Sequence, residues 1–279
     1  MFLQNLASAG SFLVMLTIIS CGFANIATAS NTSTPASKAS MDPLMDLSIE
    51  ELMQIKITSV SRREQKLSGT PSAIFVITQE DIRRSGATSI PEALRMAPGV
   101  EVARVGTDKW SISVRGFNGR FANKLQVLMD GRSVYTPLFS GVIWSQQDTL
   151  MEDIERIEVI RGPGATVWGA NAVNGVINII TKKAIDTQGA MITAGGGSFE
   201  QGFIGMRYGG KINEVTPFRI YAKGFSRDNT HSLAGSNLQD NWRSARAGFR
   251  LDHTRGIDQL TLQGDVFINR IGDSLLQPT

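Results

Sequence analysis

The segment 162–175 contains four glycines between two β-branched runs, which is first of all a candidate phosphate-binding loop. A P-loop requires Lys and then Ser or Thr after its second glycine, whereas Gly169 is followed by Ala170 and Asn171. A dinucleotide fingerprint would need a glycine in place of Val167, and no clear helix opens there. Neither phosphate loop is expected. The pattern instead predicts a strand, a glycine-rich excursion and a second strand, with backbone passing close to backbone.

Metal-binding and nucleophilic side chains are sparse. His231 and His253 lie far apart in the sequence, with no cysteine or second histidine at the spacing of metal ligands. Cys21 is the only cysteine, so no internal disulfide is expected. The net charge is +3, and basic residues are interspersed with acids, which gives no stripe for nucleic acid. We therefore expect no cofactor, no metal site, no nucleic-acid partner and no enzymatic activity.

The elements around the glycines carry an ordered set of motifs. They are PSAIFVIT at 71–78, IPEAL at 90–94, SVRG at 113–116, VLMDG at 127–131, IEVIRGP at 157–163, WGANA at 168–172 and GVINIIT at 175–181. In this order they resemble the plug domain of TonB-dependent outer-membrane receptors. The resemblance implies an α+β plug domain over residues 62–184, followed by antiparallel transmembrane β-barrel strands in 185–279.

The first residues are typical of an exported protein. Residues 1–29 combine an apolar core at 12–19 with a small-x-small sequence at 27–29, which predicts a cleaved signal peptide. The core is too short for a membrane helix, which needs about 20 apolar residues. A lipoprotein cleavage site at Cys21 is the alternative. Residues 30–54 are expected to form a flexible lead.

A β-prone run at 55–61 stands where the resembling family has its TonB box. The candidate residues are Ile57, Thr58, Ser59, Val60 and Ser61. The resemblance implies that the inner-membrane TonB complex pulls on this segment, and strand addition is the expected mode of pairing. An ordinary first strand of the plug is the alternative.

Local signals predict the elements of the plug. Capping boxes predict two short helices, with Thr78 and Asp81 for 79–85 and with Ser89 and Glu92 for 90–96. Strands are expected at 100–105, 112–114 and 125–129. Asp130-Gly131 predicts a hairpin turn into 133–135. Together these elements predict a small α+β domain with a mixed sheet.

From residue 188 onward the sequence alternates with period two. In 260–269 the even-numbered positions are apolar or glycine and the odd-numbered ones are polar, interrupted by Phe267. Apolar-out and polar-in alternation is typical of a transmembrane barrel, although a soluble sandwich also alternates. The plug motifs favour the barrel. Residues 185–279 suffice for five or six strands, whereas plugged transporters close with about 22, so we expect the front part of a longer receptor.

The resemblance also implies site residues. Charged plug residues expected to contact the barrel are Arg115, Glu155, Arg156, Glu158 and Arg161; solvated surface charge is the alternative for each. Outward plug loops offer aromatic side chains for substrate binding, namely Trp110, Phe117, Phe121, Phe139 and Trp144; packing in the core is the alternative.

The function implied is energised uptake across the outer membrane of a Gram-negative bacterium. TonB, outer-membrane lipid and a ferric chelate or other large ligand are the expected partners. A ferric siderophore is the first choice of ligand, with cobalamin, haem and oligosaccharides as alternatives. A soluble periplasmic plug acting as a binding module is a different class of function that membrane fractionation would distinguish.

Overall fold

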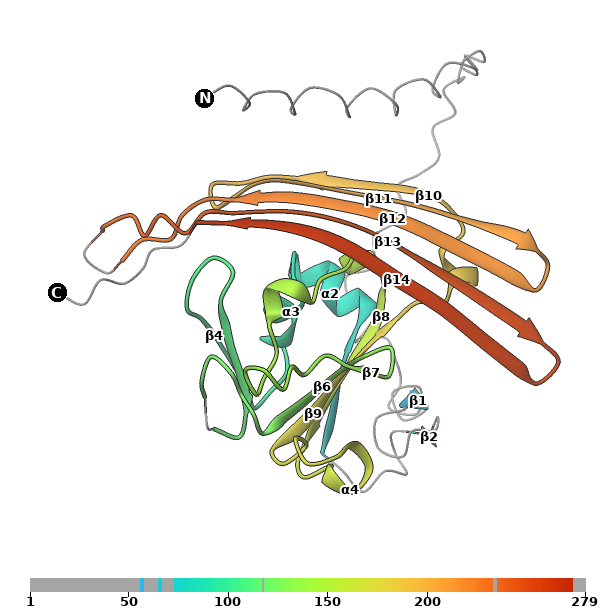
Figure 1. The fold of residues 1–279 in the computed structure, drawn as a ribbon, viewed down its shortest axis with the longest axis horizontal. Coiled ribbons are helices and arrows are strands. Elements are labelled where there is room, and N and C mark those ends of the chain that lie inside the picture. Colours follow the sequence, from blue (N-terminus) through green and yellow to red (C-terminus); the bar gives the residue numbers. More distant parts are fainter. Residues whose placement is uncertain (1–55, 58–64, 67–72, 117, 233–234, 273–279) are drawn as a thin grey trace, which may run out of the picture. The chain divides into compact units, whose positions relative to one another are not determined.

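The two largest β-sheets of the described residues have five strands each, one sheet short and mixed and the other long and antiparallel (Figure 1). The computed structural model describes residues 56–57, 65–66, 73–116, 118–232 and 235–272, all within the unit Leu47–Thr279. The predicted signal peptide, the flexible lead and most of the predicted TonB box lie outside the described residues.

The predicted plug contains the mixed sheet. Its strands, in spatial order, are β3 (Ile74–Thr78), β8 (Ile154–Arg161), β9 (Gly175–Thr181), β6 (Leu125–Met129) and β7 (Arg132–Ser133). β6 runs parallel to β9, and the other neighbours are antiparallel, so the expected mixed sheet is confirmed. The predicted hairpin turn also forms, but β7 ends at Ser133 and not at the expected residue 135. A second hairpin pairs β4 (Val100–Arg104) with β5 (Trp110–Val114).

Helix α2 (Gln79–Ser85) follows the first predicted capping box. Thr78 Oγ1 accepts a hydrogen bond from Asp81 N at 3.2 Å, and Asp81 Oδ2 accepts one from Thr78 N at 2.8 Å. Gly86, with a φ of 67°, ends the helix in the left-handed conformation that glycine adopts without strain. Both predicted ends of this helix are confirmed.

Helix α3 (Ile90–Leu94) begins where the second capping box predicts, but the box itself does not form. Ser89 makes no capping bond, and its Oγ is buried without a hydrogen-bond partner. The Glu92 carboxylate instead accepts a bond from Arg95 Nε at 2.7 Å, so it points along the helix and away from Ser89. The helix also ends before the expected residue 96, because the chain tightens into i to i+3 bonds at Arg95.

The glycine-rich excursion contains one helical turn, α4 (Ala165–Trp168), where the sequence predicts no clear helix. Gly164 O accepts a hydrogen bond from Trp168 N at 2.9 Å, and Gly169, with a φ of 93°, ends the turn. Four residues are too few to show helical periodicity, which is why the sequence gives no sign of α4.

The core of the plug comes from its β-branched strands. Ile157, Ile177 and Ile179 are fully buried and join one apolar cluster with Ile82 of α2 and Leu94 of α3. At the start of β9, a Cβ on residue 175 would lie only 2.6 Å from the carbonyl oxygen of Ile160, so this position requires a glycine. The expected close backbone approach is thus confirmed there.

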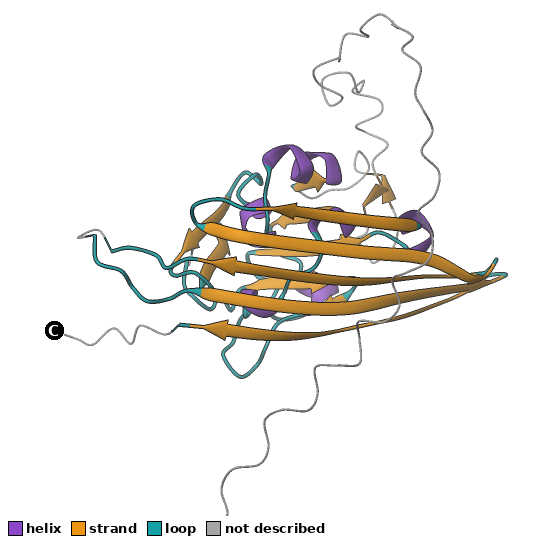
Figure 2. Ribbon diagram, turned by 90° about the horizontal axis from the view of Figure 1, so that it is seen from above, coloured by secondary structure: helices purple, strands orange, loops and turns teal. Residues whose placement is uncertain are grey.

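The long sheet is an antiparallel meander of five strands in chain order (Figure 2). The strands are β10 (Gly189–Gly195), β11 (Glu200–Asn213), β12 (Thr216–Arg227), β13 (Trp242–Arg255) and β14 (Asp258–Ile271). A short 3₁₀ helix, η4 (Ala184–Thr187), joins β9 to β10. Within the described residues β10 and β14 are the two edges and the sheet is open, in agreement with the five or six strands expected.

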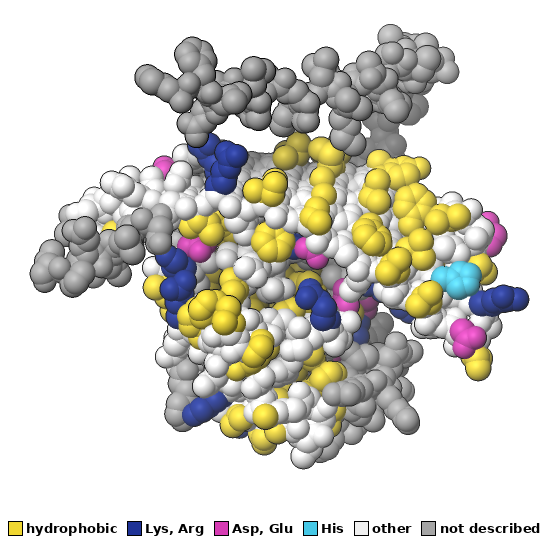
Figure 3. Space-filling model, in the orientation of Figure 1, with side chains coloured by type: hydrophobic (Ala, Val, Ile, Leu, Met, Phe, Trp, Pro, Cys, Tyr) yellow, Lys and Arg dark blue, Asp and Glu magenta, His cyan; other side chains and the backbone are white. Residues whose placement is uncertain are grey.

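Apolar side chains cover the outer face of the long sheet, the face turned away from the plug (Figure 3). Ile192, Ile220, Leu260 and Val266 are between 51% and 75% exposed. Phe267 interrupts the alternation for a local reason. It is paired with Arg246 on the inner face, where the guanidinium carbon lies 4.5 Å from the centre of the phenyl ring. No helix in the described ranges is long and apolar enough to cross a membrane.

Candidate functional site

A buried carboxylate, Asp153, lies where the plug meets the long sheet. It ends the 3₁₀ helix η3 (Met151–Asp153) and is fully buried. Its carboxylate pairs with the Arg207 guanidinium of β11, and its Oδ2 lies 3.7 Å from Nε of Arg219 in β12. Arg219 also donates to the carbonyl of Lys182 at 2.8 Å and to Thr181 Oγ1 at 3.0 Å. The guanidinium groups of Arg207 and Arg219 on the long sheet therefore bind a carboxylate and neutral oxygen atoms of the plug.

A second polar cluster surrounds Asp130 in the β6–β7 turn. Asp130 has a φ of 48° and accepts hydrogen bonds from Thr181 N and Thr181 Oγ1, both at 2.8 Å. From β13, Arg250 donates to Thr181 Oγ1 at 3.0 Å and lies 3.7 Å from Asp130 Oδ2. The neighbouring Asp252 of β13 accepts a bond from Ala184 N at 2.7 Å. This bond joins η4, the connection between plug and long sheet, to β13.

A third cluster joins the middle of the long sheet to residues before η3. Lys223 Nζ donates to Asp148 Oδ1 at 2.8 Å and to the carbonyl of Thr149 at 2.9 Å. Arg246 donates to the carbonyl of Gln146, in the 3₁₀ helix η2 (Trp144–Gln146), at 2.6 Å. Cationic side chains on β12 and β13 thus reach plug backbone as well as plug carboxylates.

We call these three clusters the polar seam, formed by Asp130, Asp148, Asp153, Arg207, Arg219, Lys223, Arg246 and Arg250. Removing ion pairs from water costs free energy, so such contacts add little net stability, yet breaking one partner leaves a buried charge that is costly. The seam therefore fixes where the plug lies on the sheet without the strong adhesion of an apolar interface.

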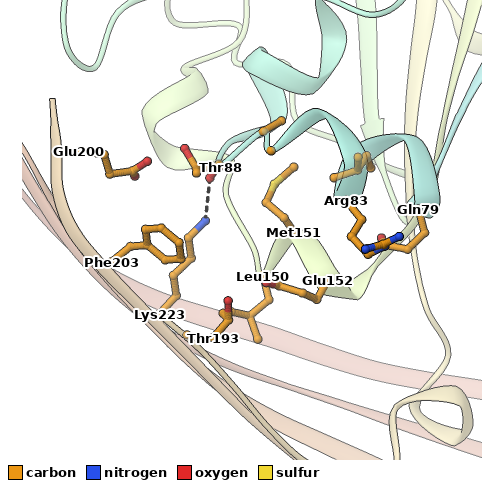
Figure 4. A pocket seen from close by; sticks show the side chains of 14 residues that line it. Gln79, Arg83, Thr88, Leu150, Met151, Glu152, Thr193, Glu200, Phe203 and Lys223 are labelled. Carbon is orange, nitrogen blue, oxygen red and sulfur yellow. Dashed lines mark hydrogen bonds between the residues drawn. The ribbon is translucent and has the colours of Figure 1, made fainter. Parts of the chain in front are cut away.

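A cavity of about 190 Å³ lies beside the polar seam (Figure 4). Its walls come from α2, from residues 86–88 and 150–152 of the plug, and from β10, β11 and β12. Leu150, Met151 and Phe203 give it an apolar lining, and the Lys223 ammonium crosses one side to the carbonyl of Thr88 at 3.4 Å. The plug is therefore not packed tightly against the sheet at this point.

Four of the five charged residues predicted to contact the barrel lie on β8, and the fifth, Arg115, directly follows β5. Arg156 pairs with Glu155 and, through Nε at 2.8 Å, with the buried carboxylate of Glu158. Arg161 donates to a backbone carbonyl of the plug at 3.3 Å, and Arg115 is exposed with a φ of 59°. These bonds join plug residues to one another, and a role at the barrel stays a prediction for all five.

The predicted aromatic residues separate into two groups. Trp110 and Trp144 are only 3% and 7% exposed and belong to the apolar core of the plug. Phe121 and Phe139 stack with ring centres 5.4 Å apart, and Phe139 is 49% exposed. Phe117 lies outside the described residues. The two tryptophans therefore pack in the core, whereas the Phe121–Phe139 pair is the part that a ligand could reach; binding by any of them stays a prediction.

Only Ile57 of the predicted TonB box is described. It belongs to β1 (Lys56–Ile57), which pairs antiparallel with β2 (Gln65–Lys66), with Ile57 opposite Gln65. Thr58, Ser59, Val60 and Ser61 lie outside the described residues. Coupling through this segment stays a prediction.

Sequence reasoning did not select the residues of the polar seam. A signal was present, because Arg246 and Arg250 lie on the polar side of the alternating pattern that predicts β13. Among the plug partners, Asp130 lies in the VLMDG motif, but Asp148 and Asp153 belong to no motif that the sequence shows. Within the described ranges, no group of three or more His, Cys, Asp or Glu side chains could hold a metal ion.

The family comparison identifies the first domain. Residues 66–176 match the family described as the TonB-dependent Receptor Plug Domain. Residues 66–176 are a TonB-dependent receptor plug domain. The expected fold, an α+β plug followed by antiparallel strands like those of the receptor barrels, is thereby confirmed.

Two relatives are vitamin B12 transporters. BtuB of Photobacterium profundum is 32% identical over 223 residues, which cover 73% of this chain and 36% of the relative. BtuB of Vibrio cholerae is 31% identical over 200 residues, which cover 71% of this chain and 31% of the relative. The chain thus spans about a third of the length of these relatives.

Solved receptor structures share the fold. The pyoverdine outer-membrane receptor FpvA of Pseudomonas aeruginosa superposes with a TM-score of 0.63 at 21% identity, over 77% of this chain and 30% of FpvA. The siderophore receptor PirA of Pseudomonas aeruginosa has a TM-score of 0.51 at 26% identity, over 73% of this chain and 36% of PirA. The matched share of this chain is larger than either the plug or the long sheet alone.

Proposed function

We propose that this chain provides the plug and the first wall strands of an outer-membrane receptor that imports a scarce, large ligand with energy from TonB. The polar seam is the observation that carries the proposal. A plug that blocks a pore must be held in place and yet be able to rearrange. Ion pairs and hydrogen bonds can exchange with water as the plug moves, whereas an apolar interface would resist separation.

The outer face of the long sheet supports placement in the outer membrane. Its exposed apolar side chains stand opposite the cations of the polar seam, as lipid and lumen require. The connections β11–β12 and β13–β14 are tight, at residues 214–215 and 256–257, while β12 and β13 are joined by the long loop 228–241. By the usual rule of short periplasmic turns, the long loop lies at the outward end.

Coupling to TonB is proposed through residues 57–61. The β1–β2 pair supports it, because Ile57 already takes part in an antiparallel ladder and so has the backbone form that strand addition needs. Each net hydrogen bond contributes about 1 kcal/mol, so a short paired segment can form and release repeatedly.

Two ligand classes follow from different observations. A ferric siderophore is the class that the sequence predicts, and the siderophore receptor PirA, at 26% identity, supports it. Cobalamin is the second candidate, favoured by the two relatives at 31% and 32% identity that are named vitamin B12 transporters.

Growth of a deletion strain separates the two ligands. One arm limits iron and supplies ferric siderophores, and the other makes growth depend on added cobalamin. We expect a defect in one arm only, restored by the gene and not by a copy lacking residues 57–61. A defect only in the cobalamin arm would reject the siderophore and keep the transporter. Normal growth and ligand uptake in both arms, with the protein in the soluble fraction, would favour a periplasmic binding module.

A further inference from the structure

A buried bond joins the tip of the β4–β5 hairpin, residues 105–109, to the long loop after β12. Thr107 is fully buried, and its backbone N–H donates to Asp240 Oδ2 at 3.0 Å. The same carboxylate accepts bonds from Thr230 N and Thr230 Oγ1, both at 2.7 Å. Asp240 is itself 5% exposed. One carboxylate thus organises its own loop and holds a backbone group of the plug.

The neighbouring turn of the long sheet reaches the same hairpin. The guanidinium carbon of Arg104 lies 4.1 Å from the ring centre of Phe199, in the turn between β10 and β11, and 4.9 Å from that of Trp110. Arg104 also donates to the carbonyls of Gly106 and Thr107, at 3.3 and 3.4 Å. Arg104 therefore stabilises the hairpin tip through bonds within the plug. Two connections at one end of the long sheet, the β10–β11 turn and loop 228–241, contact the tip from the sheet side.

We propose that Asp240 is a positioning residue that fixes the outward tip of the plug hairpin in the form that receives the ligand. This inference rests on the proposed function, because the ligand enters from the end where loop 228–241 lies. A binding surface that is already ordered loses less conformational entropy when the ligand arrives. Asp240 supplies that order through Thr107 without touching the ligand.

The test measures the mobility of the hairpin tip in the full-length protein. A spin label on Val105→Cys, in a background without other cysteines, reports the tip because Val105 is 58% exposed. We expect greater label mobility in Asp240→Ala and in the milder Asp240→Asn. Thr230→Val is the matched control, since it removes a bond to the same carboxylate but keeps the one from Thr107; its spectrum should match the parent protein. Unchanged mobility in both Asp240 variants would overturn the proposal.

Ligand binding to intact cells provides the second readout, with labelled cobalamin and a labelled ferric siderophore as probes. We expect Asp240→Ala to raise the dissociation constant of the transported probe about tenfold, as the loss of a bond to a charged acceptor implies. Thr230→Val should leave it near the parent value. Unchanged affinity in Asp240→Ala alongside normal uptake would reject the positioning role. If Asp240→Ala makes the tip mobile but the parent protein takes up neither probe, the proposed function is rejected. The structural role of Asp240 at the hairpin tip then still stands.

Discussion

At the scale of single residues, Asp153 is the fully buried carboxylate of the polar seam. It faces two arginines of the long sheet, so its loss would leave Arg207 and Arg219 without their carboxylate. We predict that Asp153→Ala lowers the free energy of unfolding by about 3–5 kcal/mol, because an unpaired buried charge is costly. Urea unfolding of the folded protein in detergent measures it, with Glu152→Gln as the neighbouring control. A loss no larger than that of the control would show that water solvates these arginines.

Asp240 should make the hairpin tip sensitive to acid. Burial raises the pKa of Asp240, but hydrogen bonds from Thr230 and Thr107 outweigh that effect and lower the pKa from 3.8 to about 2. The carboxylate therefore stabilises the fold above its ordinary pKa, and this contribution is lost as the pH falls through about 2. We predict that a label at Val105 becomes mobile over this range in the parent protein, and that Asp240→Asn is mobile at every pH.

One neighbour of Asp240 titrates separately. Burial raises the pKa of Asp108, so that side chain takes up its proton at a higher pH than Asp240 does. Asp108→Asn should therefore leave the acid step of the label in place. If the acid step disappears in Asp108→Asn and persists in Asp240→Asn, Asp108 and not Asp240 causes the acid response, which would contradict the prediction.

At the scale of elements, two helix starts in the plug provide a matched comparison. Thr78 forms both hydrogen bonds of a capping box at the start of α2, whereas Ser89 precedes α3 and makes no capping bond. We predict that Thr78→Ala lowers the free energy of unfolding by about 1 kcal/mol. Ser89→Ala should have almost no effect, since its hydroxyl is buried without a partner. Denaturant unfolding compares the two; equal losses would mean that the box contributes nothing.

The predicted coupling segment can be tested apart from the binding surface. We predict that Val60→Pro abolishes energised uptake while surface binding stays near normal, because proline removes an N–H and restricts the strand. Val60→Ala, which keeps the N–H, is the control and should retain uptake. Both assays run on the same cells. Normal uptake by the proline variant would place the coupling segment elsewhere, for example nearer residues 44–52.

Local signals predicted elements well and contacts between domains poorly. The box at Thr78 and the turn at Asp130-Gly131 form as expected, because each depends on neighbours in the sequence. Ser89 has the same residue pattern as Thr78, yet Arg95 binds Glu92 and the box is lost. The polar seam depends on partners such as Asp153 and Arg207 that are far apart in the chain. Sequence periodicity indicated the inward face of the sheet but not the carboxylates that it meets.

At the scale of the whole molecule, the long sheet separates two environments. Its outer face is apolar, and its inner face offers cations to a plug that supplies carboxylates and carbonyls. A cavity beside the seam leaves room for side chains to shift at the contact. This division of surfaces agrees with the proposed function, in which the outer face contacts lipid and the plug is held reversibly.

The most direct test of this account is the initial rate of ligand uptake by cells with and without TonB, measured beside ligand binding at the cell surface. Labelled ferric siderophore and labelled cobalamin serve as probes in a strain whose only receptor for them is the full-length protein. We predict that one of the two probes binds equally to cells with and without TonB and enters only the cells that contain TonB. Entry at the same rate without TonB would contradict the central claim, as would the absence of any binding that depends on this protein.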